Sequence, residues 1–173
     1  MESRVVKRST SVAMAMPVAL AIAISGCTGN PFAPPLGDSA AGLWNDQHSV
    51  GGLLSNFVNS YLYRDSLRYS DCLAESFLFI YYDPESGRFD QWYRLTDLRT
   101  TGALFRTFDD IRLAFATVPS DVANFNLPDS VLSFQVAFNL EIGGQLPIFG
   151  YARFESRRED DGKFRLISWR DDF

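Results

Sequence analysis

Three side chains have the types and spacing of a small acid–base site. Asp90 and Asp97 flank the aromatic pair Trp92–Tyr93, and Tyr61 lies on an earlier amphipathic segment. A carboxyl group buried beside aromatic rings has a raised pKa and can exchange a proton with a substrate. The alternative is that Asp90 faces water and that Asp97 lies in the first turn of a helix, where its charge is favourable. The second interpretation is favoured, so these three residues are only weak catalytic candidates.

The other residues that could do chemistry form no motif. Asp109–Asp110, Asp160–Asp161 and Asp171–Asp172 are adjacent acids at predicted turns or strand ends, where solvated charge is the usual role. The single histidine, His48, has no second histidine with which to share a metal ion. The sequence contains no GxSxG, HExxH, phosphate-loop or CxxC pattern. We therefore expect no metal ion and no cofactor.

One of the two cysteines ends a targeting signal. Basic residues at positions 4–8 precede an apolar run from 12 to 24, which is shorter than the roughly 20 residues of a membrane-spanning helix. The run ends in Ile24-Ser25-Gly26-Cys27, which resembles the lipobox of bacterial lipoproteins. The resemblance implies cleavage before Cys27 and lipidation of its thiol. A plain signal peptide or an uncleaved anchor is the alternative.

The lipobox resemblance also implies a place in the cell. Three acyl chains would hold the protein permanently on a membrane of the bacterial envelope, with the domain facing the periplasm. Thr28 follows the cysteine where an aspartate would imply retention at the inner membrane, so the outer membrane is favoured. The second cysteine, Cys72, lies among apolar residues, and we expect it to be a buried structural thiol.

Residues 27–44 are rich in proline, glycine and alanine and are predicted to form a tether, followed by one domain over residues 45–173. After removal of residues 1–26, 147 residues remain, with 13 Lys and Arg against 20 Asp and Glu. This acidic balance argues against nucleic acid as a partner, because such a partner requires a basic surface.

The hydrophobic pattern predicts helices first and a sheet afterwards. A first helix, capped by Asn45 or Asp46, is followed by one from Asp65 to about Ala74 and later by a third capped by Thr96. Strands are predicted at the following positions: 77–82, 88–93, 111–115, 132–142, 148–156 and 164–170. Gly143–Gly144 predicts a two-residue hairpin. Helices grouped before such strands indicate an α+β domain with a curved antiparallel sheet.

Residues 57–84 (FVNSYLYRDSLRYSDCLAESFLFIYYDP) and 161–172 (DGKFRLISWRDD) resemble the opening helices, first strand and last strand of the nuclear transport factor 2-like superfamily, which includes SnoaL-like cyclases and ketosteroid isomerases. The resemblance implies a cone in which helices close one side of a curved sheet around a pocket. Aligning Asp65 with the family's interhelix acid places Phe57, Tyr81 and Gly150 at the catalytic positions of ketosteroid isomerase. None of the three matches, so the resemblance implies no such reaction.

The leading hypothesis is therefore a membrane-anchored, non-catalytic binding or accessory module for an apolar or amphipathic small molecule. The family resemblance also implies pairing of two copies through the sheet. Aromatic side chains expected to line the pocket are Phe57, Tyr61, Trp92, Phe105, Phe134, Phe138 and Trp169. The alternative for these rings is that they form a filled aromatic core. The alternative for the function is a small isomerase, dehydratase or hydrolase that uses Asp90 or Asp97. An envelope assembly protein without a pocket is a third possibility.

Overall fold

The computed structural model describes residues 42–127, 130–145 and 147–172, which belong to one compact unit, Leu36–Phe173. Its helices are α1 (Val50–Leu62), α2 (Ser66–Asp71), α3 (Arg94–Thr107) and α4 (Ser120–Ala123). Its strands are β1 (Leu73–Asp83), β2 (Arg88–Tyr93), β3 (Ile111–Phe115), β4 (Val131–Ile142), β5 (Ile148–Arg158) and β6 (Phe164–Asp172). The predicted lipobox lies outside the described residues. Within those residues, no helix has the length and apolar character needed to cross a bilayer.

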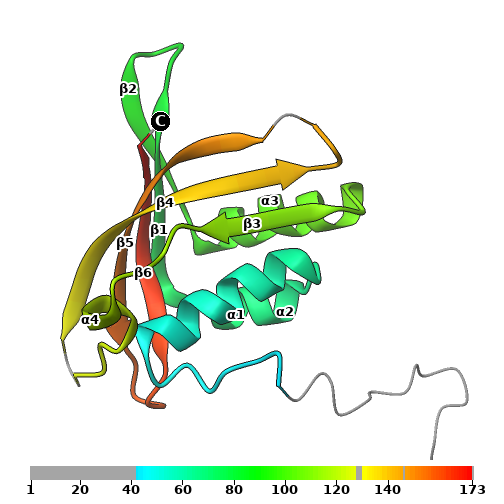
Figure 1. Cartoon of the computed structure of the whole chain (residues 1–173). Coiled ribbons are helices and arrows are strands. Elements are labelled where there is room, and N and C mark those ends of the chain that lie inside the picture. The colour runs from blue at the N-terminus through cyan, green and yellow to red at the C-terminus, as the bar shows by residue number, and fades with distance from the viewer. Residues whose placement is uncertain (1–41, 128–129, 146, 173) are drawn as a thin grey trace, which may run out of the picture. The chain divides into compact units, whose positions relative to one another are not determined.

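The six strands form one curved sheet in the order β2-β1-β6-β5-β4-β3 (Figure 1). All neighbours are antiparallel except β1 and β6, which run parallel. The predicted fold of helices packed on a curved sheet is confirmed, but the sheet, predicted to be antiparallel, is mixed because of the β1–β6 pair. Hairpins between consecutive strands can be predicted from their turn residues. The strands β1 and β6 are separated in the sequence by more than half of the domain, and no turn motif joins them, so their pairing could not be predicted in this way.

The three longer helices cover one face of the sheet, and the hydrophobic core lies between the two layers (Figure 1). Successive strand residues point to opposite faces, so alternate residues of β4, such as Phe134, Val136 and Phe138, enter the core. The α1 side chains Leu53, Leu54 and Phe57 meet them from the other side. The helical and strand periods predicted from the sequence therefore converge on one core.

Two of the three predicted helix starts, those of α1 and α3, differ from the observed ones. The α1 cap is Ser49, whose side chain accepts a hydrogen bond from the Gly52 amide, while Asp46 accepts one from the His48 amide instead. Asp65 caps α2 as predicted, but the helix ends at Asp71 and not near Ala74. The third helix begins at Arg94 without a side-chain cap, so Thr96 does not start it. Several residues in each segment could serve as caps, and tertiary packing selects among them.

The segment before α1 is fixed against the domain. Asn45 and Asn56 exchange two hydrogen bonds, from the Asn45 amide at 2.7 Å and back to its carbonyl at 2.8 Å. The Asn59 side chain donates to the Leu43 carbonyl, and the Trp44 ring lies 6.2 Å from that of Tyr63. Well-defined contacts with α1 are therefore already present at residues 43–45.

The predicted strands are present at the expected places, and β2 and β3 have the predicted bounds. Gly143 and Gly144 both have positive φ, but β5 begins only at Ile148, so they do not form a two-residue hairpin between β4 and β5. The short helix α4 was not predicted. Four residues are too few to show a helical period, so its presence follows from packing against α1.

Candidate functional site

A buried carboxylate lies where α2, β2 and α3 meet. Asp97, in the first turn of α3, is only 3% exposed. The Tyr69 hydroxyl of α2 donates a hydrogen bond to its Oδ2 at 2.7 Å, and Trp92 Nε1 of β2 donates to its Oδ1 at 3.1 Å. Both carboxylate oxygens therefore have a donor, as a buried charge requires.

The environment of Asp97 favours its protonated form. Burial raises the pKa of the carboxyl group, and the hydrogen bonds from Tyr69 and Trp92 oppose that rise only in part. Burial also raises the pKa of Tyr69 well above its ordinary value, with a further contribution from the Tyr61 and Asp97 charges. Asp97 can therefore exchange a proton nearer to neutral pH than a solvated aspartate, whereas Tyr69 acts as a hydrogen-bond donor.

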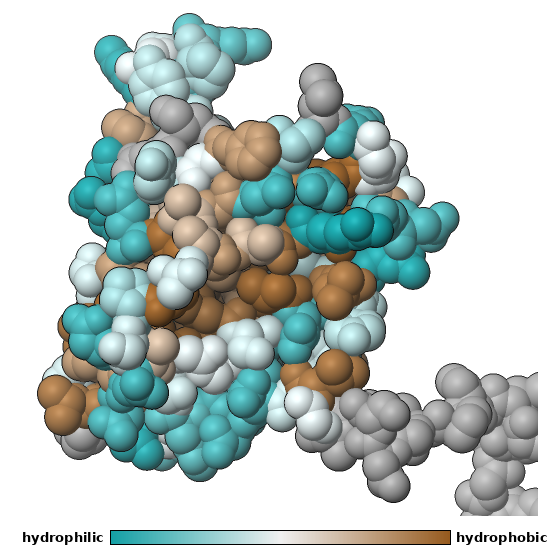
Figure 2. Space-filling view, in the orientation of Figure 1, coloured by the Kyte–Doolittle hydropathy of each residue, from teal (hydrophilic) through white to brown (hydrophobic). Residues whose placement is uncertain are grey.

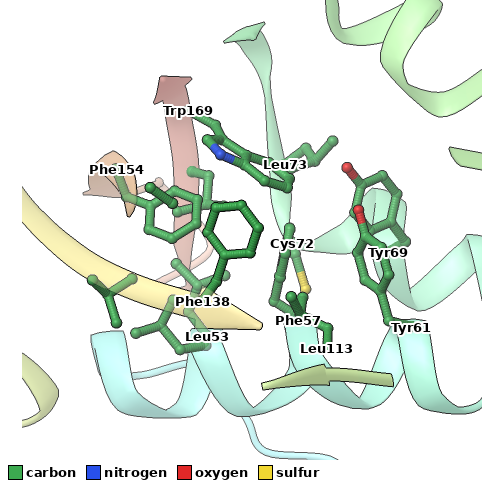
Figure 3. Packing of buried hydrophobic residues seen from close by; sticks show 14 of the residues in the cluster. Leu53, Phe57, Tyr61, Tyr69, Cys72, Leu73, Leu113, Phe138, Phe154 and Trp169 are labelled. Atoms are coloured by element: carbon green, nitrogen blue, oxygen red, sulfur yellow. The ribbon is translucent and has the colours of Figure 1, made fainter. Parts of the chain in front are cut away.

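Tyr61 joins this network from α1. Its hydroxyl lies near the side chains of Tyr69 and Thr101, and Figure 3 shows the hydroxyls of Tyr61 and Tyr69 side by side. Burial raises the pKa of Tyr61, and the nearby charges of Asp97 and Asp171 raise it further. Two of the three sequence candidates, Tyr61 and Asp97, are thus brought together.

Asp90 is not part of the network. It is exposed on β2, where its Oδ2 accepts a hydrogen bond from the Tyr81 hydroxyl at 3.3 Å. The interpretation that Asp90 faces water is confirmed, and Asp97 does lie in the first turn of its helix. The near-complete burial of Asp97 and its tyrosine partner were not predicted. Tyr69 was missed because it falls in a short helix with no clear period.

Asp171 is a second buried carboxylate, and the expectation that it is solvated was wrong. It is 7% exposed and accepts a hydrogen bond from Trp169 Nε1 on the same strand. Residues two apart in a strand share a face, so the burial of Trp169 carries Asp171 inward. This spacing in the sequence was a signal that could have identified it.

The aromatic residues expected to line a pocket are packed against one another. Six of the seven are less than 10% exposed, and Trp92 is half-buried. Phe57 lies among the rings of Tyr61, Tyr69, Phe115, Phe154 and Trp169, with centroid separations of 5.4–6.1 Å (Figure 3). These distances are those of directly contacting rings, so this region forms a filled aromatic core.

Two adjoining hollows open on either side of the edge strand β3, with volumes of about 360 and about 290 Å³. They share Ala114, Phe115 and Ala116; the first also includes Leu54 and Val58 of α1, and the second includes Phe138 and Phe149. We call the two together the β3 groove. Figure 2 shows hydrophobic side chains gathered on the face that carries α1, β3 and β4. Neither hollow is lined by Asp97 or Tyr61.

Comparisons with known proteins agree on the architecture. No protein-family model and no curated protein matches the chain. Among solved structures, a nuclear transport factor 2-like protein of unknown function from Shewanella baltica has a TM-score of 0.52 and 12% identity, over 72% of this chain and 90% of that one. A proposed dehydratase of the same family from Streptomyces avermitilis has a TM-score of 0.53 and 14% identity, over 71% of this chain and 92% of that one.

A third similar structure is a proposed aromatic ring hydroxylase from Novosphingobium aromaticivorans, with a TM-score of 0.50 and 14% identity over 74% of this chain and 88% of that one. At such identities the likeness shows the fold alone. The domain has the nuclear transport factor 2-like fold, an α+β architecture in which helices pack on a curved, unclosed, mixed sheet.

Proposed function

We propose that the protein is a lipoprotein of the bacterial envelope whose domain is a non-catalytic binding module for an apolar or amphipathic small molecule, held in the β3 groove. The observation that carries the proposal is the contrast between the two parts of the domain. The groove is open and mostly apolar, whereas the carboxylates that could do chemistry are buried with their hydrogen-bond donors.

The size and lining of the groove support a small ligand. Each hollow is near the lower end of the range typical of ligand pockets, and the two meet along β3. Phe115, Phe138 and Phe149 supply apolar contact area, while Ser55 and Asn59 supply hydrogen-bonding groups at the α1 side. A ligand with an apolar body and one polar end would match this distribution.

Binding can be tested with a neutral apolar fluorophore such as N-phenyl-1-naphthylamine. An Ala116→Arg substitution places a long charged side chain in the shared part of the groove, and we expect at least about a tenfold loss of affinity, since an apolar ligand that covers this charge would remove its water without pairing it. Ala103→Arg, at an exposed position of α3 outside the groove, is the matched control. Equal binding by both variants would contradict the groove as the site.

The native ligand can be sought by native mass spectrometry of the protein purified from its own envelope, before and after denaturation. A small molecule that is lost on denaturation supports the binding module. A bare protein bound to another protein would instead support envelope assembly.

Lipid attachment can be tested independently of the ligand. In cells grown with an alkyne-labelled fatty acid, we expect the protein to incorporate label and Cys27→Ser to abolish it. Cys72→Ser is the control, because Cys72 is buried and its pKa is raised to about 12 by burial. Labelling that persists in Cys27→Ser would contradict the lipobox. Fractionation of inner and outer membranes then tests the proposed outer-membrane position.

The second candidate function is that of an isomerase or dehydratase that uses Asp97. Its specific support is the raised pKa of Asp97 between two aromatic donors, together with the proposed dehydratase among the similar structures. It requires an opening to Asp97, and Asp97 is not among the residues that line the three cavities described in this article. Rapid hydrogen exchange of the Trp92 indole and the Tyr69 hydroxyl in NMR spectra would favour it, whereas protected signals would count against it.

A further inference from the structure

A third cavity lies where β1 separates from its neighbour β6, at the ends of strands in the interior of the sheet. The register between these strands moves from Leu73 opposite Leu166 to Leu78 opposite Ser168, so β1 bulges away by several residues. The bulge leaves a cleft of about 440 Å³ between the end of α2, the start of β1 and the adjoining ends of β5 and β6. Three arginines line it, namely Arg94, Arg157 and Arg165, and we call it the arginine cleft.

Arg94 has an unused donor. Its Nη2 donates to the Ser70 carbonyl at 3.1 Å, and its Nη1 lies 3.3 Å from Glu75. Its Nε is buried and finds no acceptor within the described part of the chain. A buried donor without a partner is unusual in folded proteins, because its hydration is lost without compensation.

The other two arginines are direct neighbours. Arg157 of β5 lies opposite Arg165 of β6 in the strand register, a placement that like charges disfavour. Arg165 is held by two hydrogen bonds to Asp161 and one to the Asp71 carbonyl. Arg157 contacts Glu159 at 3.0 Å and remains 42% exposed in its side chain. The cleft thus holds three guanidinium groups from three elements, and its lining also includes the carboxyl groups of Asp71, Glu75 and Glu159.

We propose that the arginine cleft binds the oxyanion of a small soluble molecule, a carboxylate or a phosphate. Guanidinium groups present paired N–H donors that match both anions, and either anion would supply an acceptor of the kind that the buried Arg94 Nε lacks. Glu75 occupies one guanidinium nitrogen of Arg94, but its side chain is 91% exposed, so its hold is weak and an incoming anion can displace it. This site is separate from the β3 groove and does not depend on the function proposed for it.

The test is a calorimetric titration of the full-length protein in detergent with inorganic phosphate and, separately, with succinate, at constant ionic strength. We expect binding of at least one anion and a loss of affinity of about tenfold or more in Arg94→Gln, as for a lost charge-assisted hydrogen bond. The control is Arg99→Gln, exposed on the same helix and outside the cleft, which should bind as the native protein does. The anion that binds identifies the ligand as a phosphate or a carboxylate compound.

A second variant keeps the test decisive if Arg94→Gln folds poorly. Glu75→Gln removes the competing carboxylate, and we expect affinity to increase about two- to fivefold, the strength of an exposed ion pair. Glu85→Gln, at the exposed turn after β1, should have no effect. Failure of both anions to bind, or binding that Arg94→Gln and Glu75→Gln leave unchanged, would overturn the proposal. The fluorophore experiment on the β3 groove is unaffected by either result.

Discussion

Asp97 is a buried carboxylate in which both oxygens still accept a hydrogen bond. A buried carboxylate is destabilising unless its oxygens are hydrogen-bonded, and Tyr69 and Trp92 meet that need from two different elements. The same side chains link α2, β2 and α3 at the edge of the aromatic core. The network therefore fixes the relative position of three elements, and each of its hydrogen bonds can be tested singly.

Removal of the Tyr69 hydroxyl should destabilise the domain. Tyr69→Phe keeps the ring and leaves Asp97 with one donor fewer, which we expect to lower the free energy of unfolding by about 1–3 kcal/mol. Urea unfolding measures the change. Tyr63→Phe is the control, because the Tyr63 side chain is about half exposed. An equal effect of the two substitutions would show that the hydrogen bond to Asp97 is not what stabilises the site.

The raised pKa of Asp97 predicts a pH dependence of stability with a defined sign. The folded protein holds the proton of Asp97 more tightly than the unfolded chain, whose pKa is near 3.8. The contribution of Asp97 to stability is therefore complete below that value and is lost as the pH rises through the folded pKa. We expect unfolding curves from about pH 3 to about pH 8 to show this loss in the native protein and not in Asp97→Asn.

Asp161 provides a contrast of opposite sign. Its hydrogen bonds with Arg165 lower its pKa to about 2, so its contribution is present above pH 3.8 and is lost as the pH falls toward 2. Asp161→Asn should therefore remove a stability change on the acid side only. If Asp97→Asn and Asp161→Asn altered the pH profile of stability in the same direction, the inference that burial raises the pKa of Asp97 would be wrong.

Helix α1 shows why a pair of glycines can have different roles. The sequence indicates only that Gly51 and Gly52 weaken the helix. In the structure, a Cβ atom on Gly51 would lie 2.9 Å from the Ala123 carbonyl of α4, whereas one on Gly52 would meet its neighbours at 3.4–3.5 Å. Gly51 thus allows α4 to approach α1, and Gly52 has no such requirement.

Two alanine substitutions should therefore have opposite effects. Gly52→Ala should stabilise the domain by up to about 1 kcal/mol, the difference in helix propensity. Gly51→Ala should destabilise it, because α4 must move to accommodate the new methyl group. Thermal unfolding of the two variants is the measurement, and each serves as the control for the other. Stabilisation by both would show that α4 does not pack closely on α1.

The start of α1 offers a further comparison. Ser49→Ala removes the side chain that caps the Gly52 amide, and we expect a loss of about 1 kcal/mol in the free energy of unfolding. Asp46→Ala removes an exposed hydrogen bond from the His48 amide and an exposed contact with His48 Nδ1, and it should cost less. Chemical unfolding of both variants compares the observed cap, Ser49, with the cap expected from the sequence, Asp46. A larger loss of unfolding free energy in Asp46→Ala would show that Asp46 is the cap.

Elements were predictable where a long period marks them, whereas several helix ends were not. The period of two in β4 and the helical spacing of Leu53, Leu54, Phe57 and Tyr61 placed these elements correctly. The cap of α1, the end of α2 and the presence of α4 depend on contacts between distant segments. The candidate site follows the same division. Asp97 and Tyr61 were candidates by type and spacing, and the spacing of Asp171 from Trp169 was a signal as well, whereas Tyr69 and the arginine cleft arise from the way the elements meet.

Local stability should differ across the whole sheet. Strands β5 and β6 are central and carry buried residues such as Ala152, Phe154, Phe164 and Leu166. The hairpin of β1 and β2 extends beyond the helices in Figure 1, and five of the six residues of β2 are exposed. Hydrogen exchange should therefore be slowest in β5 and β6 and faster at residues 82–91. Uniform exchange over the sheet would contradict this order and indicate that the domain opens only as a whole.

The position of β6 ties folding to a late stage of synthesis. Because β6 lies between β1 and β5, the middle of the sheet stays empty until residues 164–172 have been made. The earlier segments can form helices and hairpins, but they cannot close the core around Phe57 and Phe154 without Phe164, Leu166 and Trp169. The core therefore cannot close before residues 164–172 have left the ribosome. Under the envelope position proposed above, such a delay would help to keep the chain competent for transport across the membrane.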